Sequence, residues 1–115
     1  MGSSVHQVTI DSSDPSGLAS FWEQVLDYRR TYEDGDMVEI EPRDGAGNAL
    51  LFLKVPDSKK VKNRIHLDLK PTDQDAEVER VKSLGATEVD IGQGDVTWVV
   101  LADPEGNEFC ILRPR

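Results

Sequence analysis

The sequence contains one strand-to-helix pattern twice, and this repeat constrains the fold more than any other feature. The first copy opens at Gln7 and the second at His66, each in a short stretch of alternating polar and apolar residues. An aspartate follows seven positions after each opening residue, Asp14 in one copy and Asp73 in the other. Aspartate is a preferred residue for capping the start of a helix. A chain of 115 residues with such a repeat is expected to form one small domain built from two similar modules.

Both copies continue with the same predicted order of elements. In the first copy, alternation predicts a strand, Asp14 and Pro15 mark a helix start, and Asp34-Gly35-Asp36 indicates a hairpin turn. The predicted strands of the first copy cover residues 5–11, 29–33, 37–41 and 49–55, with a helix over 15–26. Those of the second copy cover residues 65–70, 87–91, 96–101 and 108–112, with a helix over 75–84 and turns over 92–95 and 103–107.

These elements predict an α+β fold made of two tandem βαβββ modules. We place the modules at residues 5–55 and 64–113, with a linker over residues 56–63. The strands are expected to form an open, cup-shaped mixed β-sheet, with one helix of each module on the outside. The whole chain, residues 1–115, is then a single domain.

Composition and charge exclude several classes of partner. A net charge of −9 argues against a sequence-independent nucleic-acid surface and against anionic membranes. No apolar run approaches the ~18 residues of a membrane span, and the first residues lack the apolar region of a secretory signal. Cys110 is the one cysteine, which excludes an intrachain disulfide and fits the reducing cytoplasm. We therefore expect a cytoplasmic protein without nucleic-acid or membrane partners.

The positive charge is unevenly distributed along the sequence. Five of the thirteen basic residues lie in or beside the linker: Lys54, Lys59, Lys60, Lys62 and Arg64. The segment is either a solvated linker or a mobile flap that meets an anionic ligand.

Four features occur together and in order along the chain: the helix start at Asp14 and Pro15, the stretch from Phe21 to Leu26, the strand with His66, and the turn from Asp103 to Asn107. In this combination the sequence resembles the vicinal oxygen chelate superfamily, which includes glyoxalases, extradiol dioxygenases and bleomycin- and fosfomycin-resistance proteins. The resemblance runs from Val5 to Leu112 and is closest to small bacterial glyoxalase-like domain proteins. It implies paired βαβββ modules that form an open cup, usually in a homodimer, and we expect a homodimer here.

The resemblance also implies where a metal would bind. Enzymes of the superfamily typically hold a divalent metal with four side chains, one from the first and one from the last strand of each module. Transferred to this chain, these positions are Gln7, Phe52, His66 and Cys110. A phenyl ring offers no donor atom, and Cys110 stands where a carboxylate is expected. We therefore predict no native metal site and no cofactor.

The predicted concave face combines aromatic and aliphatic side chains with a few polar groups, the usual composition of a small-molecule site. Strand alternation places most of its residues, and the resemblance adds Trp98 and Val100. The predicted ligand-binding residues are Gln7, Thr9, Asp11, Phe52, His66, Asp68, Trp98, Val100, Glu108 and Cys110.

Two functions from different classes fit this face. The first is a binding protein that sequesters a drug or metabolite, as the bleomycin-resistance branch does, with the carboxylates Asp11, Asp68 and Glu108 favouring a cationic group. The second is a lyase or isomerase that uses His66 as general base and Asp68 to orient it. His66 can equally be a hydrogen-bonded polar residue without catalytic role, and Cys110 is expected to be a small core residue rather than a nucleophile.

Overall fold

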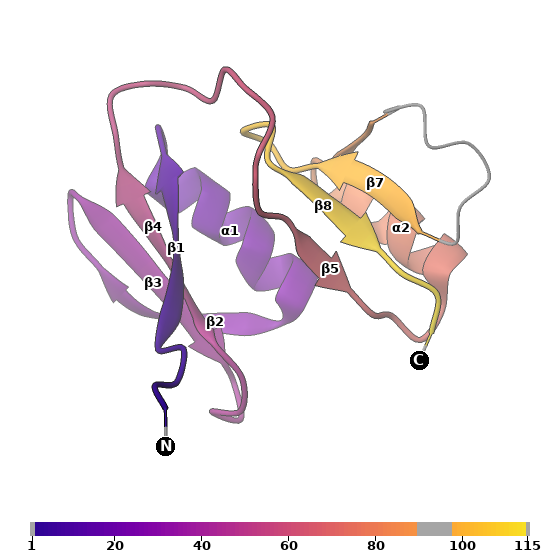
Figure 1. Cartoon of the computed structure of the whole chain (residues 1–115), viewed down its shortest axis with the longest axis horizontal. Coiled ribbons are helices and arrows are strands. Elements are labelled where there is room, and N and C mark those ends of the chain that lie inside the picture. Colours follow the sequence, from indigo (N-terminus) through magenta and orange to yellow (C-terminus); the bar gives the residue numbers. More distant parts are fainter. Residues whose placement is uncertain (1, 90–97, 115) are drawn as a thin grey trace. The chain divides into compact units, whose positions relative to one another are not determined.

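The computed structural model describes residues 2–89 and 98–114 (Figure 1). The chain divides into two compact units, Met1–Ser58 and Lys59–Arg115, so the division falls inside the predicted linker. Within the described residues, each unit has one helix and one four-stranded mixed sheet in the order βαβββ. The α+β class and the two-module plan are confirmed.

The first unit forms a sheet with strand order β1-β4-β3-β2. Strand β1 runs parallel to β4, and β3 is antiparallel to both β4 and β2. The elements are β1 (Gln7–Ser12), α1 (Pro15–Leu26), β2 (Tyr28–Glu33), β3 (Met37–Pro42) and β4 (Ala49–Lys54).

The second unit repeats this topology with strand order β5-β8-β7-β6. Strand β5 runs parallel to β8, and the remaining neighbours are antiparallel. The elements are β5 (Leu67–Leu69), α2 (Gln74–Ser83), β6 (Thr87–Glu88), β7 (Val99–Ala102) and β8 (Glu108–Ile111). Strand β5 is shorter than predicted, so His66 immediately precedes it. The turn predicted over residues 92–95 and the adjoining ends of its two strands lie outside the described residues.

An aspartate caps the start of each helix, including the cap predicted at Asp14. The Asp14 carboxylate accepts a hydrogen bond from the Gly17 amide at 3.2 Å, and Asp73 accepts one from the Ala76 amide at 3.0 Å. Each bond satisfies an amide of the first helical turn that has no partner within the helix. None of the helices in the described part of the chain is long and apolar enough to cross a membrane.

The core of the first unit lies between α1 and one face of its sheet. The strand register places Phe52 beside Ile10 on one side and Val38 on the other, so these three side chains share a face. Phe52 is completely buried, as is Ile40 of the same face. Helix α1 contacts β1, β2, β3 and β4 and contributes the buried Phe21 and Trp22, whose rings meet edge to face.

The second unit separates its two sheet faces in the same way. Phe109 and Ile111 of β8 and Leu101 of β7 are buried and alternate with residues of the opposite face. On that opposite face, Cys110 lies between Asp68 of β5 and Val100 of β7. Strand alternation in β8 therefore directs the Cys110 side chain to the sheet face opposite Phe109 and Ile111.

Candidate functional site

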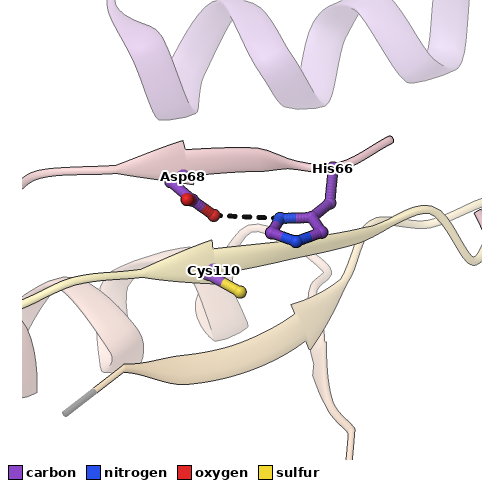
Figure 2. A group of neighbouring side chains, drawn as sticks. All are labelled: His66, Asp68 and Cys110. Atoms are coloured by element: carbon purple, nitrogen blue, oxygen red, sulfur yellow. Dashed lines mark ion pairs between the residues drawn. The ribbon is translucent and has the colours of Figure 1, made fainter. Parts of the chain in front are cut away.

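Three polar side chains gather on the second sheet: His66, Asp68 and Cys110. Asp68 and Cys110 are register partners on the parallel pair β5 and β8, and His66 lies two residues before Asp68 on the same side of the chain. The candidate donor atoms of the three side chains all lie within 4.8 Å of one another. Figure 2 shows the imidazole turned toward Asp68, with the Cys110 thiol beside them on the next strand.

His66 and Asp68 form a direct polar contact. The Nδ1 atom of His66 lies 2.9 Å from Oδ1 of Asp68, and their side chains are 44% and 49% exposed. An ionised carboxylate can only accept, so this contact favours the proton on Nδ1 of His66. In the neutral ring, Nε2 is then left as an acceptor. A ligand that reaches this face would meet an accessible basic nitrogen.

Cys110, on the neighbouring strand β8, is the third residue of the cluster. Its side chain is 6% exposed, and burial raises the pKa of the thiol, with the Asp68 charge raising it further and Lys62 acting in the opposite direction. The thiol is therefore protonated near neutral pH, and it lies within 4.8 Å of the donor atoms of Asp68 and His66. Since the thiolate is the nucleophilic form, this environment does not activate Cys110 for nucleophilic attack.

Glu108 lies at the start of β8 and binds the basic segment. Lys59 Nζ is 3.4 Å from Glu108 Oε2, and their side chains are 24% and 13% exposed. Burial raises the pKa of the Glu108 carboxyl, but a hydrogen bond from its own backbone amide and the charges of Lys59 and Lys62 outweigh this, so that the pKa is lowered. Asn63 donates to Asn107 at 3.1 Å. Within the basic segment, Lys59 therefore pairs with a largely buried carboxylate of the second unit.

The first sheet presents Gln7, Thr9 and Asp11 on one face, as predicted from alternation. The register places Thr9 beside Leu51 and Asp11 beside Leu53. Thr9 and Asp11 are exposed and Gln7 is half-buried.

Phe52 does not share that face, and its prediction as a ligand-binding residue beside Gln7 is wrong. It is paired with Ile10, and its ring is 0% exposed within the core. Neighbouring strands in register project their paired side chains to the same side, so Phe52 belongs with the residues that α1 covers. Leu51 is the β4 residue that lies beside Thr9, on the face where Phe52 was expected, and it is half-buried.

Sequence reasoning missed Leu51, although the repeat contains a signal for it. The spacing in sequence between Asp14 and Asp73 also separates Asn48 from Asn107. The same spacing makes Leu51 the counterpart of Cys110 in the repeat. The structure agrees, because Thr9 pairs with Leu51 as Asp68 pairs with Cys110.

The two remaining predicted residues belong to the second unit. Trp98 is 39% exposed and immediately precedes β7, whereas Val100 is 4% exposed and lies beside Cys110. Trp98 is accessible to a ligand, and Val100 contributes apolar packing next to the thiol.

The side chains do not fit the four-ligand metal set implied by the family. Leu51 has no donor atom, and neither has Phe52 in the core. In the described part of the chain, His66, Asp68 and Cys110 are the one group of at least three His, Cys, Asp or Glu residues close enough to share an ion. Metal binding requires a thiolate, whereas burial and the Asp68 charge raise the pKa of the Cys110 thiol.

Comparison with known proteins gives a consistent result. The model of the family described as "Glyoxalase-like domain" matches residues 7–112. No curated protein matches the chain significantly.

Solved structures resemble the chain over almost its whole length. A fosfomycin resistance protein, FosX, from Listeria monocytogenes in complex with Mn(II) and sulfate has a TM-score of 0.79 at 16% identity, covering 100% of this chain and 93% of that one. FosX from Mesorhizobium loti has a TM-score of 0.73 at 18% identity, covering 97% and 92%. A glyoxalase/bleomycin resistance protein/dioxygenase family enzyme from Burkholderia phytofirmans has a TM-score of 0.72 at 17% identity, covering 95% and 97%. At these identities the likeness establishes the fold.

Proposed function

Since the chain belongs to the glyoxalase-like domain family, we propose that it binds a small organic molecule on the sheet face that carries His66, Asp68 and Cys110, without a complete metal site. The observation that supports this most is the position of Asp68, which lies 2.9 Å from His66 Nδ1 and beside Cys110 in register. A fixed polar group beside apolar side chains is typical of a site that orients a ligand. Sequestration of a drug or metabolite is the activity that such a site supports without further chemistry.

In the second unit, the exposed side chains of this face are the ones that a ligand would contact. His66, Asp68 and Trp98 are accessible, and Val100 and Cys110 supply a buried apolar floor. The exposed indole of Trp98 can stack on an aromatic ring of the ligand. Gln7, Thr9 and Asp11 of the first sheet remain proposed ligand-binding residues.

The charge preference of the site now depends mainly on Asp68. Glu108, one of the three carboxylates expected to favour a cationic group, is already paired with Lys59. Asp68, the other carboxylate on this face of the second unit, is 49% exposed, so water partly screens its charge. We retain a modest preference for cationic over anionic aromatic ligands.

A second candidate function is acid-base catalysis by the same residues. The contact between His66 Nδ1 and Asp68 Oδ1 is the specific observation that favours it, because a carboxylate at one ring nitrogen orients the other as a base. This candidate predicts a lyase or isomerase whose activity is lost with His66.

The proposal includes a homodimeric, cytoplasmic protein of bacterial type. Cys110 is a free thiol, which is compatible with a reducing compartment. Strands β1 and β2 are the edges of the first sheet, and edge strands are commonly covered by pairing with another chain.

Binding can be tested by titrating the protein with benzylamine and benzoate, an aromatic cation and an aromatic anion of similar size. Trp98 should report binding through its fluorescence, whereas Trp22 is 1% exposed and should not respond. Benzylamine is expected to bind more tightly, and His66→Ala should weaken its binding while His6→Ala, which changes the one other histidine, should not. Absence of saturable binding to either probe, or equal effects of the two histidine substitutions, would contradict the proposed site.

A further inference from the structure

A short basic segment is attached to the second unit at both of its ends. It covers residues 59–63, carries three lysines, and is called the basic strap below. At one end, Lys59 Nζ lies 3.4 Å from Glu108 Oε2. At the other end, the Asn63 side chain donates a hydrogen bond to Asn107 at 3.1 Å. Both contacts are made with the beginning of β8, so the basic strap lies beside the start of that strand.

The basic strap borders the sheet face that carries the proposed ligand site. Glu108 and Cys110 are two residues apart in β8 and alternate with the buried Phe109, so their side chains share this face. Two residues of a strand span roughly 6.6 Å. Asp68 is the register partner of Cys110 on the neighbouring strand β5. The Lys59 ammonium, which pairs with Glu108, therefore lies at one end of the face on which Asp68 is exposed.

Lys62 is a cation of the basic strap that remains available to a ligand. It directly precedes the attachment point at Asn63, it is exposed, and it makes no ion pair with the residues that the structure describes. Burial raises the pKa of both the Glu108 carboxyl and the Cys110 thiol, and the Lys62 charge acts on both pKa values in the opposite direction. The influence of Lys62 on these two side chains agrees with the position that the attachment points give it.

We propose that the site takes zwitterionic aromatic molecules, with Asp68 binding their cationic group and Lys62 their anionic group. This inference deepens the proposed binding function and rests on it. A molecule with opposite charges at the two ends of one ring meets both charged residues of this face. A simple aromatic cation meets only Asp68, and a simple aromatic anion meets only Lys62.

The attachment of the basic strap can be measured without any ligand. In ¹⁵N-labelled protein, backbone amides 60–62 should show order parameters near the roughly 0.85 of rigid backbone. Asn63→Ala removes one attachment and should lower these order parameters, whereas those of β8 should stay high. Wild-type order parameters below about 0.6 at these amides would show a flexible segment that is not held at the site face, and the proposal would be wrong.

Ligand binding is tested with benzylamine and 4-(aminomethyl)benzoate, which is benzylamine with a carboxylate at the far end of the ring. The zwitterion should bind the wild type roughly 2- to 5-fold more tightly, the range for an ion pair with an exposed lysine. Lys62→Met should abolish this difference without weakening the binding of benzylamine. Fluorescence of Trp98, which is 39% exposed, measures both affinities.

Two further lysines provide matched controls for charge. Lys60→Met removes the same charge from the same segment, and Lys70→Met removes it just beyond the other end of β5. Both variants should keep the preference for the zwitterion, and equal losses in either of them and in Lys62→Met would contradict the role of Lys62. Equal binding of the two probes to the wild type overturns the zwitterion preference while the binding function stands. If neither probe binds, the binding function fails and the ligand class fails with it.

Discussion

The Lys59–Glu108 pair should stabilise the second unit, and substitution of Lys59 by methionine tests this. The substitution keeps the aliphatic length of the side chain and removes the charge. The Glu108 side chain is 13% exposed, and its Oε2 atom has no hydrogen-bond partner among the described residues. Lys59→Met therefore leaves a largely buried carboxylate without its ion-pair partner. A buried ionised group that loses its partner is destabilising because its lost hydration is not replaced.

The size of the effect follows from the exposure of the two groups. Truncating one partner of a fully buried ion pair costs about 3–5 kcal/mol. Lys59 is 24% exposed, and Lys62 also acts on the Glu108 charge, so the cost should be reduced. We expect Lys59→Met to lower the free energy of unfolding by about 1–2 kcal/mol at pH 7, near the range for an unsatisfied charged acceptor.

The effect should disappear in acid. The pKa of Glu108 is lowered in the folded protein, so its contribution to stability is present above the unfolded pKa of about 4.3 and is lost as the pH falls through the lower folded value. The difference between wild type and Lys59→Met should therefore be largest near neutral pH and shrink below about pH 4.

Urea unfolding followed by circular dichroism at several pH values measures this difference. Lys60→Met is the matched control, because Lys60 is exposed and makes no ion pair in the described part of the structure. Equal destabilisation by both substitutions, or a Lys59→Met effect that stays constant down to pH 3, would show that Lys59 does not act through the Glu108 charge.

Four further predictions are independent of this pair. Phe52→Glu should cost at least about 3 kcal/mol or prevent folding because it places a charge in the core, whereas Leu51→Glu, on the other face, should fold with a near-wild-type melting temperature; the reverse order would contradict the β1–β4 register. Asp73→Ala should lower the unfolding free energy by about 1 kcal/mol through loss of the α2 cap, and a thermal melt unchanged from wild type would count against it. Protein purified without chelator should contain far less than one Ni, Zn, Mn or Fe per chain by elemental analysis, and one metal per chain that is lost in His66→Ala would contradict this. Light scattering should give the mass of a homodimer, and a monomer mass at all concentrations would exclude it.

Local sequence signals predicted the elements and one of the two site faces. Asp14 begins its helix where capping chemistry placed it, and Asp73, its counterpart in the repeat, caps the second helix. In β8 the alternation is unambiguous, because Phe109 and Ile111 are large and apolar while Glu108 and Cys110 are smaller or polar. The shared face of Asp68 and Cys110 followed from this contrast.

The first sheet was harder to predict because β4 is apolar on both faces. Ala49 to Leu53 contains no polar residue, so alternation alone cannot decide whether Leu51 or Phe52 faces the helix. The decision comes from pairing with β3, where buried Val38 and Ile40 alternate with glutamates. Such pairing joins segments that are distant in sequence, and so does the contact between Lys59 and Glu108, which has no local signature.

Because the topology repeats, the first unit contains the positions of the His66–Asp68–Cys110 cluster with different residues. Gln7, Thr9 and Leu51 occupy in the first unit the places that His66, Asp68 and Cys110 occupy in the second. A protein engineer can therefore transfer the three side chains within one polypeptide, through Gln7→His, Thr9→Asp and Leu51→Cys, onto a sheet of the same strand order. Such a transfer separates what the backbone contributes to the chemistry from what the surrounding side chains contribute, a distinction that most enzymes and receptors offer only through comparison with distant relatives.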